Sequence, residues 1–431
     1  MEAGFARVSI TPPLGTRLMG FSARDHEQGC TAIHDDVFVR ALYLEQGGEA
    51  ALIIGYDLCF IGRAEADRYK TEIERELWLV PAQVLMNASH SHVGPAVGRW
   101  DYGGYEPPDT RYLDLLGEAT LRAARDARRA AEAVTVWAGA TQSKLPMNRR
   151  RPENGAIAFA PNPEGFVFDA LPVCLLKGRD DRPVCLLFSV SCHPSMMAGW
   201  EVSAEYPGAA TDRLDARLGA PVSFFLQGTG GDAKPSLIGA GLERFRPATW
   251  DDVAKAGEMV AGEVAEVLAG GLTRVEPGLR TCLMEVSWPM EAPLSGEGYA
   301  AIADDAGAGE VRRWWAQRIV ATLARGEQLP SAVKLILQGL RIGEGLRLVA
   351  LEGEPVAGYG ALMERFYGSG ITFPLGYSNG EGLYLPTSEM LDEGGYEVGS
   401  FWEYGFPARL AQGFEGILTE ALEKLREAGI A

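Results

Sequence analysis

The sequence predicts an α/β fold from two patterns. Short apolar runs bounded by turn residues alternate with longer segments of helical periodicity, which is typical of α/β architecture. Hydrophobic residues make up 47% of the chain and charged residues 23%, close to the average of globular proteins. No repeat of fixed period interrupts the 431 residues. Length alone leaves the domain count open, because single α/β enzymes often exceed the usual domain size.

Each expected element follows from a local pattern. Strands are expected where apolar and β-branched residues form short runs, at 37–44, 51–56, 83–87, 134–138, 184–189, 222–226 and 347–351. Helices are expected at 63–77, 111–133, 250–268, 310–325 and 408–428. In the helix at 111–133, the buried stripe is formed by Leu113, Leu116, Ala119, Ala123 and Ala127.

Two regions break this alternation. Residues 100–110 combine Gly, Pro and Asp with aromatic residues, and loops of this kind tend to line binding sites. Residues 289–339 are rich in Gly and Ala and lead into a helix that carries Trp314 and Trp315. This second region is either a lid or subdomain over a pocket, or an ordinary helical insertion whose tryptophans pack on the core.

Charge and cysteine content exclude several classes of protein. With 40 basic and 58 acidic residues the net charge is −18, and without a long basic run no nucleic-acid partner is expected. No apolar stretch approaches the roughly 20 residues that span a bilayer, so no membrane span is expected. The first residues lack the bases and apolar run of a secretory signal, which favours a cytoplasmic location. The six cysteines form no C-x-x-C pair, as expected of reduced, mostly buried thiols.

Three of the five histidines follow predicted strands. His90 and His92 come after 83–87, and His193 comes after 184–189. Side chains at the carboxyl ends of sheet strands project into the crevice where α/β enzymes bind ligands. An H-x-H spacing on an extended segment directs both rings to one side, so one ring suits a metal and the other a metal or acid–base chemistry. The alternative is a pair of histidines that bond only to the backbone.

Acidic and basic candidates occupy similar positions. Glu354 and Asp57 follow the strands at 347–351 and 51–56, and Asp232 lies in a Gly-rich loop after 222–226. That loop is not a phosphate loop, because the Walker spacing is missing. The Asn-Arg-Arg-Arg run at 148–151 either offers donors to a carboxylate or sugar-like group or is a solvated basic turn.

Short motifs are also distributed in one order over nearly the whole chain. They are Ala6-Arg7-Val8-Ser9-Ile10-Thr11-Pro12-Pro13, Ile33-His34-Asp35, Arg40-Ala41, Ser89-His90-Ser91-His92-Val93-Gly94-Pro95, Asn148-Arg149, His193-Pro194, Gly231-Asp232, Gly353-Glu354, Tyr384-Leu385-Pro386-Thr387 and Tyr396-Glu397. This set resembles the N-terminal catalytic domain of the neutral/alkaline non-lysosomal ceramidase family. The resemblance implies mixed β-sheets flanked by helices and a single catalytic domain over residues 1–431.

The resemblance also implies one zinc ion per chain. Its ligands would be the residues that match the family's metal-binding motifs: His90, His193, Glu354 and Tyr384. Two imidazoles, a carboxylate and a phenolate suit a catalytic zinc that still accepts a water or substrate oxygen. By the same resemblance His92, Arg149 and Tyr396 line the pocket, with Tyr396 donating to an oxyanion. Arg150 and His34 are further candidates for substrate binding.

The chain departs from the family at three points. Lys234 stands where the family has its nucleophilic serine, which puts a covalent route in doubt. Arg150 and Arg151 replace the Ser-Pro of the family's Asn-Arg-Ser-Pro and make this wall of the expected substrate pocket more cationic. The sequence ends at Ala431, where ceramidases continue into an immunoglobulin-like domain. Ceramide is therefore not the expected substrate.

These observations favour a cytoplasmic zinc-dependent hydrolase. A metal-activated water would attack an amide or ester carbonyl of a small polar substrate, anionic or sugar-like. His92 or Asp232 would be the general base. Lys234, Arg149 and Tyr396 would stabilise negative charge, and Lys234 could also shuttle protons. Two alternatives remain: a zinc-dependent isomerase or lyase that acts on a sugar-like molecule, and a non-catalytic binding protein. The sequence specifies neither the substrate nor the oligomeric state.

Overall fold

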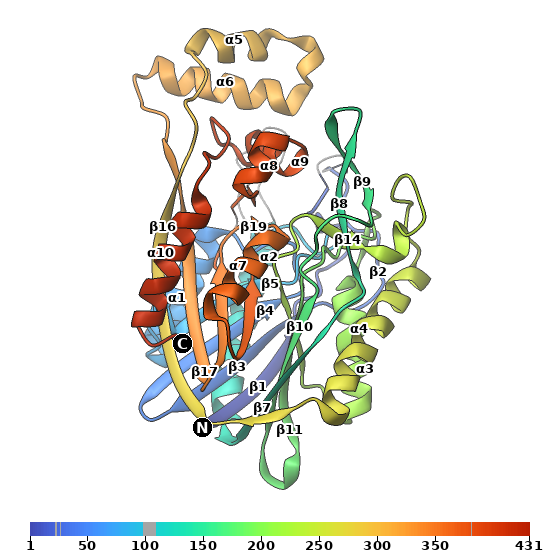
Figure 1. The fold of residues 1–431 in the computed structure, drawn as a ribbon, viewed down its shortest axis with the longest axis vertical. Coiled ribbons are helices and arrows are strands. Elements are labelled where there is room, and N and C mark those ends of the chain that lie inside the picture. Colours follow the sequence, from blue (N-terminus) through green and yellow to red (C-terminus); the bar gives the residue numbers. More distant parts are fainter. Residues whose placement is uncertain (22–23, 26, 98–108, 381) are drawn as a thin grey trace.

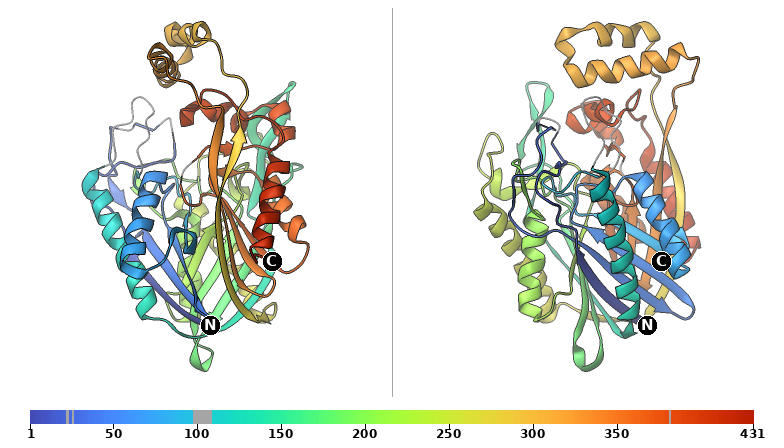
Figure 2. Two further views of the ribbon diagram at one scale, coloured as in Figure 1. Left: turned by 90° about the vertical axis from the view of Figure 1, so that its left-hand side faces the viewer. Right: turned by 180° about the vertical axis from the view of Figure 1, so that it is seen from behind.

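Three mixed β-sheets pack around one apolar core and carry helices on their outer faces (Figures 1 and 2). The computed structural model describes residues 1–21, 24–25, 27–97, 109–380 and 382–431. Because both faces of each sheet are covered, strands such as the one at 183–190 are apolar almost throughout. This architecture confirms the predicted α/β fold.

The first sheet has the order β5-β4-β3-β1-β6. Its strands are β1 (Glu2–Ser9), β3 (Phe38–Gln46), β4 (Glu49–Tyr56), β5 (Val84–Ala88) and β6 (Glu132–Ala133). All neighbours are antiparallel except β4 and β5, which run parallel and are joined through α1 (Arg63–Leu77). Side chains alternate between faces, so Leu42 enters the central core while Tyr43 packs under α1 and α2 (Thr110–Arg129).

The second sheet has the order β13-β11-β10-β7-β15. Its strands are β7 (Thr135–Gln142), β10 (Ala170–Lys177), β11 (Pro183–Val190), β13 (Ser223–Gln227) and β15 (Thr273–Val275). Here β11 and β13 form the parallel pair. The helices α3 (Glu205–Leu218) and α4 (Trp250–Gly270) cover its outer face through a separate apolar cluster.

The third sheet has the order β16-β17-β18-β20. Its strands are β16 (Pro277–Pro289), β17 (Ala332–Gly343), β18 (Leu346–Leu351) and β20 (Ile371–Leu375). The parallel pair is β18 and β20, and α7 (Ala357–Tyr367) and α10 (Phe414–Glu427) pack on the outer face.

Smaller elements complete the structure. The remaining strands are β2 (Ala32–Ile33), β8 (Pro146–Glu153), β9 (Ala156–Asn162), β12 (Glu201–Val202), β14 (Ala233–Pro235), β19 (Glu354–Pro355) and β21 (Tyr384–Leu385). The short helices are η1 (Pro81–Gln83), η2 (Arg179–Asp181), η3 (Ser236–Ile238), η4 (Ala306–Ala308), α8 (Ser388–Glu393), α9 (Tyr396–Gly399) and η5 (Ser400–Tyr404). None of the helices in the described part of the chain is long and apolar enough to cross a membrane.

The carboxyl ends of the three parallel pairs meet at one place, where Asn87 links them. Asn87, the fourth residue of β5, donates from Nδ2 to the carbonyl oxygen of Gly376 at 2.8 Å, just after β20. Its Oδ1 accepts the backbone N–H of Gln227, the last residue of β13, at 2.9 Å. One buried amide therefore fixes the relative positions of all three strand ends.

The insertion between β16 and β17 forms two helices, α5 (Gly296–Asp304) and α6 (Glu310–Ala324). They lie beyond the end of the long β16–β17 pair and form one end of the molecule, away from both termini (Figure 1). Trp315 is buried in a small apolar cluster of these helices with Phe401 and Trp402, whereas Trp314 is partly exposed. Trp315 thus packs on the η5 segment rather than on the central core.

The predicted elements are confirmed with shifted ends. All seven predicted strands are present, but the helix expected at 111–133 ends at Arg129, because 132–133 pair with β1. The helix expected at 408–428 begins only at Phe414. The helix α3 is not predicted, since its Pro207 and Gly208 resemble a turn; proline is nevertheless tolerated in a first helical turn. Five of the six cysteines are buried, as expected, and no disulfide joins any of them in the described structure.

Candidate metal centre

Three buried donor atoms converge where the strand ends meet. Nε2 of His90 lies 3.3 Å and Nε2 of His193 lies 3.1 Å from the same carboxylate oxygen, Oε2 of Glu354. These ligand atoms lie within 4.8 Å of one another, and all three residues are buried. Each residue follows a strand of a different sheet, β5, β11 or β18. The structure therefore brings together three of the four expected metal ligands as a group that could hold a metal ion.

The other ring nitrogen of each histidine is held by a backbone carbonyl. Nδ1 of His90 lies 2.9 Å from the oxygen of Cys59, and Nδ1 of His193 lies 2.7 Å from the oxygen of Gly230. A carbonyl only accepts, so each Nδ1 carries a proton, and each Nε2 would be the atom that binds a metal. Burial, reinforced by the charge of Arg149, lowers the pKa of His193 to about 3. His193 is consequently neutral at physiological pH, as a metal ligand must be.

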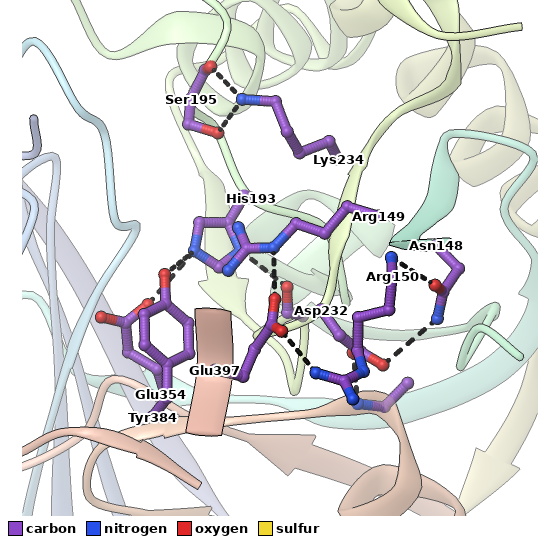
Figure 3. A network of polar contacts seen from close by, with 12 residues as sticks. Asn148, Arg149, Arg150, His193, Ser195, Asp232, Lys234, Glu354, Tyr384 and Glu397 are labelled. Atoms are coloured by element: carbon purple, nitrogen blue, oxygen red, sulfur yellow. Dashed lines mark hydrogen bonds and ion pairs between the residues drawn. The ribbon is translucent and has the colours of Figure 1, made fainter. Parts of the chain in front are cut away.

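Tyr384, the fourth expected ligand, lies against this group. Its hydroxyl is 3.1 Å from Nε2 of His193, and the two rings are stacked (Figure 3). The short strand β21, which begins with Tyr384, runs parallel to β19, which begins with Glu354. Burial raises the pKa of the Tyr384 hydroxyl, and the nearby Arg149 opposes that shift. Local pairing thus places the phenol beside the three donors.

Two tyrosines in the site were not found from the sequence. The Tyr404 hydroxyl donates to Oε1 of Glu354 at 2.6 Å, which leaves Oε2 facing the imidazoles. The Tyr377 ring lies 4.2 Å from the His90 ring, and its buried hydroxyl has no hydrogen-bond partner among the described residues. The only signal for Tyr404 is the aromatic run Phe-Trp-Glu-Tyr between two glycines, at 401–404.

His92 faces the cluster, but not for the predicted reason. Its Nε2 lies 3.0 Å from Nε2 of His90, so the two rings do meet. The segment is not extended, however: β5 ends at Ala88, and His90 has a φ of 67°, in the left-handed region. Burial and the neighbouring histidines hold the pKa of His92 well below its usual value, and its buried Nδ1 has no hydrogen-bond partner in the described structure.

The two arginines of the predicted cationic wall differ in what they bind. Nε of Arg149 donates to Oε1 of Glu397 at 2.8 Å, and Nη1 of Arg150 donates to Oε2 of the same residue at 2.7 Å. Arg150 Nη2 is also engaged, by Glu393 and by the carbonyl of Gly394. Arg149 Nη2 is buried and has no hydrogen-bond partner among the described residues. Only Arg149 therefore keeps a guanidinium nitrogen available for a substrate.

Asp232 and Lys234 are both buried: Asp232 lies on the loop between β13 and β14, and Lys234 lies on β14. Asp232 Oδ1 accepts the backbone N–H of Ala357, the first residue of α7, at 2.8 Å, and burial raises its pKa to about 6. Lys234 Nζ donates to the carbonyl and the hydroxyl of Ser195, both at 2.9 Å (Figure 3). Burial, followed by the charge of Arg149, lowers the Lys234 pKa to about 8. Asp232 thus anchors the helix that follows Glu354, while Lys234 has no ion pair with any described carboxylate.

The remaining predicted residues lie at the rim or further away. Tyr396 is 39% exposed, its ring lies 5.4 Å from that of Tyr384, and its hydroxyl bonds to Glu403. His34 stacks on Trp250 and bonds to Asp35, and no contact described here joins it to the metal-ligand group. The loop expected to line the site is 100–110, and its residues 100–108 fall outside the described residues.

Comparison with solved structures supports the fold prediction. A ceramidase complexed with C2 matches with a TM-score of 0.73 and 16% identity, covering 99% of this chain and 75% of that chain. Neutral ceramidase from Pseudomonas aeruginosa matches with a TM-score of 0.71 and 16% identity, covering 98% of this chain and 73% of that chain. No protein-family model and no curated protein matches the sequence. The chain has the neutral ceramidase fold, as its motifs predict.

Proposed function

We propose that the protein is a zinc-dependent hydrolase that cleaves an amide or ester bond of a small polar substrate with water as the nucleophile. The observation that carries this proposal is the convergence of His90 Nε2, His193 Nε2 and Glu354 Oε2. Both imidazoles are oriented by carbonyls through Nδ1, a common feature of metal-binding histidines. A binding role alone would not require such an arrangement.

The residues present fit zinc better than a harder or softer metal. Two imidazoles and one carboxylate form the protein ligand set of many catalytic zinc sites, with Tyr384 as a fourth donor beside them. Calcium or magnesium would require mainly oxygen ligands. Cys59 forms a second buried group of possible ligands with His90 and His92, but its Sγ faces His90 Nδ1 at 3.6 Å and not the Nε2 that faces Glu354. The group of His90, His193 and Glu354 therefore contains no thiolate. When bound, zinc would lower the pKa of a water and polarise the substrate carbonyl.

The surrounding side chains supply the other parts of the reaction. Without a metal, the 3.0 Å contact requires a proton between Nε2 of His92 and Nε2 of His90. With a metal on His90 Nε2, neutral His92 would carry its proton on Nδ1, and its Nε2 could accept the proton of the attacking water and return it to the leaving group. Arg149 Nη2 has no hydrogen-bond partner of good geometry among the described residues, and the guanidinium lies beside the Tyr384 hydroxyl. Nη2 can therefore donate to a substrate oxygen on which negative charge develops. We also propose that Tyr396, at the exposed rim beside Tyr384, turns its hydroxyl from Glu403 to the same substrate.

The substrate we propose is anionic or sugar-like and is not ceramide. Lys234 is a buried cation without a carboxylate partner among the described residues, and Arg149 is a second cation close enough to shift its pKa. Arg149 is already paired with Glu397, so the uncompensated charge is that of Lys234. A purely apolar ligand is disfavoured, because it would offer no polar partner to Lys234 or to Arg149 Nη2. A substrate carboxylate or several hydroxyls would compensate them.

Turnover measurements test this proposal. The zinc-loaded protein is screened against small N-acyl amino acids, neutral amides and esters, each with and without a chelator. We expect turnover that a chelator removes, with one oxygen from labelled water in the acid product. His90→Ala should abolish it, and His34→Ala, a histidine outside the metal-ligand group, should not. Solvent exchange of a substrate proton without cleavage would instead support the isomerase, and no turnover with any substrate would contradict an enzyme of this class.

A further inference from the structure

We infer that the α5–α6 insertion supports the metal centre, with Trp315, Tyr299 and Tyr404 as positioning residues for Glu354. The inference rests on the proposed metal site and assigns a role to a part of the chain that lies outside it. The connection runs through one short segment, residues 400–411. One side of this segment contacts the insertion, and the other contacts the metal-binding carboxylate.

The contacts on the side of the insertion are specific. Trp315 Nε1 donates to the carbonyl oxygen of Phe406 at 3.0 Å, and its ring packs against Phe401 at 6.1 Å between centroids. The Tyr299 hydroxyl donates to the carbonyl oxygen of Pro407 at 2.7 Å. Two backbone bonds at the base of the insertion, from Glu291 N to Arg409 O and from Ala411 N to Pro289 O, continue the same contact.

The contacts on the opposite side reach the metal centre. Tyr404, the last residue of η5, donates its hydroxyl to Oε1 of Glu354. Glu403, its neighbour, accepts the hydroxyl of the rim residue Tyr396 at 3.3 Å. Within η5, Phe401 and Trp402 therefore pack on the insertion, and the next two residues, Glu403 and Tyr404, reach the site.

This arrangement determines which carboxylate oxygen is available. With Oε1 occupied by Tyr404, Glu354 presents only Oε2 to His90 and His193. The 3-10 turn has few internal hydrogen bonds of its own, so its position depends on what packs against it. Partners that orient a metal ligand typically change metal affinity by about 10- to 100-fold. Displacing η5 should therefore weaken metal binding even though the insertion contacts no ligand directly.

The adjacent tryptophans provide a matched pair of variants. Trp315 is buried against η5, whereas Trp314 is partly exposed and stacks on Arg318 of its own helix. Zinc affinity of the full-length protein is measured by competition with a chromophoric chelator for Trp315→Ala, Trp314→Ala, Tyr404→Phe and the Trp315→Ala/Tyr404→Phe double variant. Circular dichroism verifies folding of each. If Trp315→Ala does not fold, Tyr299→Phe, which deletes only one hydroxyl, replaces it.

We expect Tyr404→Phe to weaken zinc binding by about 10- to 100-fold and Trp315→Ala by a comparable or smaller factor. Trp314→Ala should bind zinc as the wild type does, and the double variant should bind no more weakly than Tyr404→Phe alone. If the insertion were merely structural, Trp315→Ala would lower thermal stability without this pattern of zinc affinities. The inference would be overturned if Trp315→Ala bound zinc as tightly as the wild type. It would also be overturned if the double variant lost affinity by the product of the Trp315→Ala and Tyr404→Phe effects. Neither result would affect the proposed function. A wild-type protein that binds no zinc would overturn the proposed function as well.

Discussion

Replacing Asn87 by alanine should uncouple the three strand ends that form the site. In the wild type, Asn87 Oδ1 accepts the N–H of Gln227, and its Nδ2 donates to the carbonyl oxygen of Gly376 and to the Ser378 hydroxyl. The Gly376 oxygen keeps a second bond from the Ser378 hydroxyl at 2.6 Å, so it is not left unpaired. The Gln227 N–H, in contrast, loses its partner inside a fully buried region.

The cost can be estimated from these contacts. One buried donor without a partner costs about 1–3 kcal/mol, and the second lost bond adds about 0.5–1.5 kcal/mol. We therefore expect Asn87→Ala to lower the free energy of unfolding by roughly 2–4 kcal/mol, a large part of the typical 5–15 kcal/mol. Zinc affinity should fall too, because His90 follows three residues after Asn87.

Urea unfolding of the metal-free protein measures the first effect directly. Gln142→Ala is the matched control, since Gln142 is an exposed amide at the end of β7 and surface substitutions usually change stability by less than about 0.5 kcal/mol. Equal free energies of unfolding for the two variants would refute the reasoning that one amide joins the three sheets.

Three further predictions concern the buried ionisable groups. His92→Gln should lower kcat by about 10²- to 10⁴-fold with unchanged zinc content, because it removes the proton acceptor; an unchanged kcat would exclude that role. Lys234→Met should lower the ratio of kcat/KM for anionic over neutral substrates by about 30-fold or more. Arg151→Met is the control and should preserve this ratio, because the Arg151 cation pairs with Glu153. A preserved ratio in Lys234→Met would show that the substrate anion does not bind at Lys234. Burial raises the Glu205 pKa from 4.5 to about 8, so the stabilising contribution of Glu205 is complete below pH 4.5 and is lost as pH rises toward 8. Glu205→Gln should therefore flatten the fall of Tm between pH 5 and 8. An unchanged slope of Tm against pH would contradict the raised pKa.

The convergence of His90, His193 and Glu354 could be predicted because it depends on strand ends. Each residue follows an apolar run, and the carboxyl ends of parallel strands deliver side chains to one edge of a sheet. The sequence does not reveal that three separate sheets contribute one residue each. That arrangement depends on the packing of the central core and on the hydrogen bonds of Asn87.

Other parts of the site could not be predicted, because their partners lie far away in the sequence. Arg150 is of a residue type that often binds substrates, yet its guanidinium is paired with Glu397, 247 positions later in the sequence. Asp232 has the position of a base, yet it anchors Ala357, 125 positions later. Tyr404 reaches Glu354 only through the fold of η5. The residue types indicate what each side chain can do, and the tertiary contacts determine what it is free to do.

The metal centre itself is tested most directly by the zinc content and zinc K-edge X-ray absorption spectrum of the purified protein. We predict about one zinc per chain with nitrogen and oxygen ligands that include two imidazoles. His193→Ala and Glu354→Gln should lose the metal, and His34→Ala should retain it. A protein without zinc, or with the same zinc spectrum after removal of His193, would contradict the account.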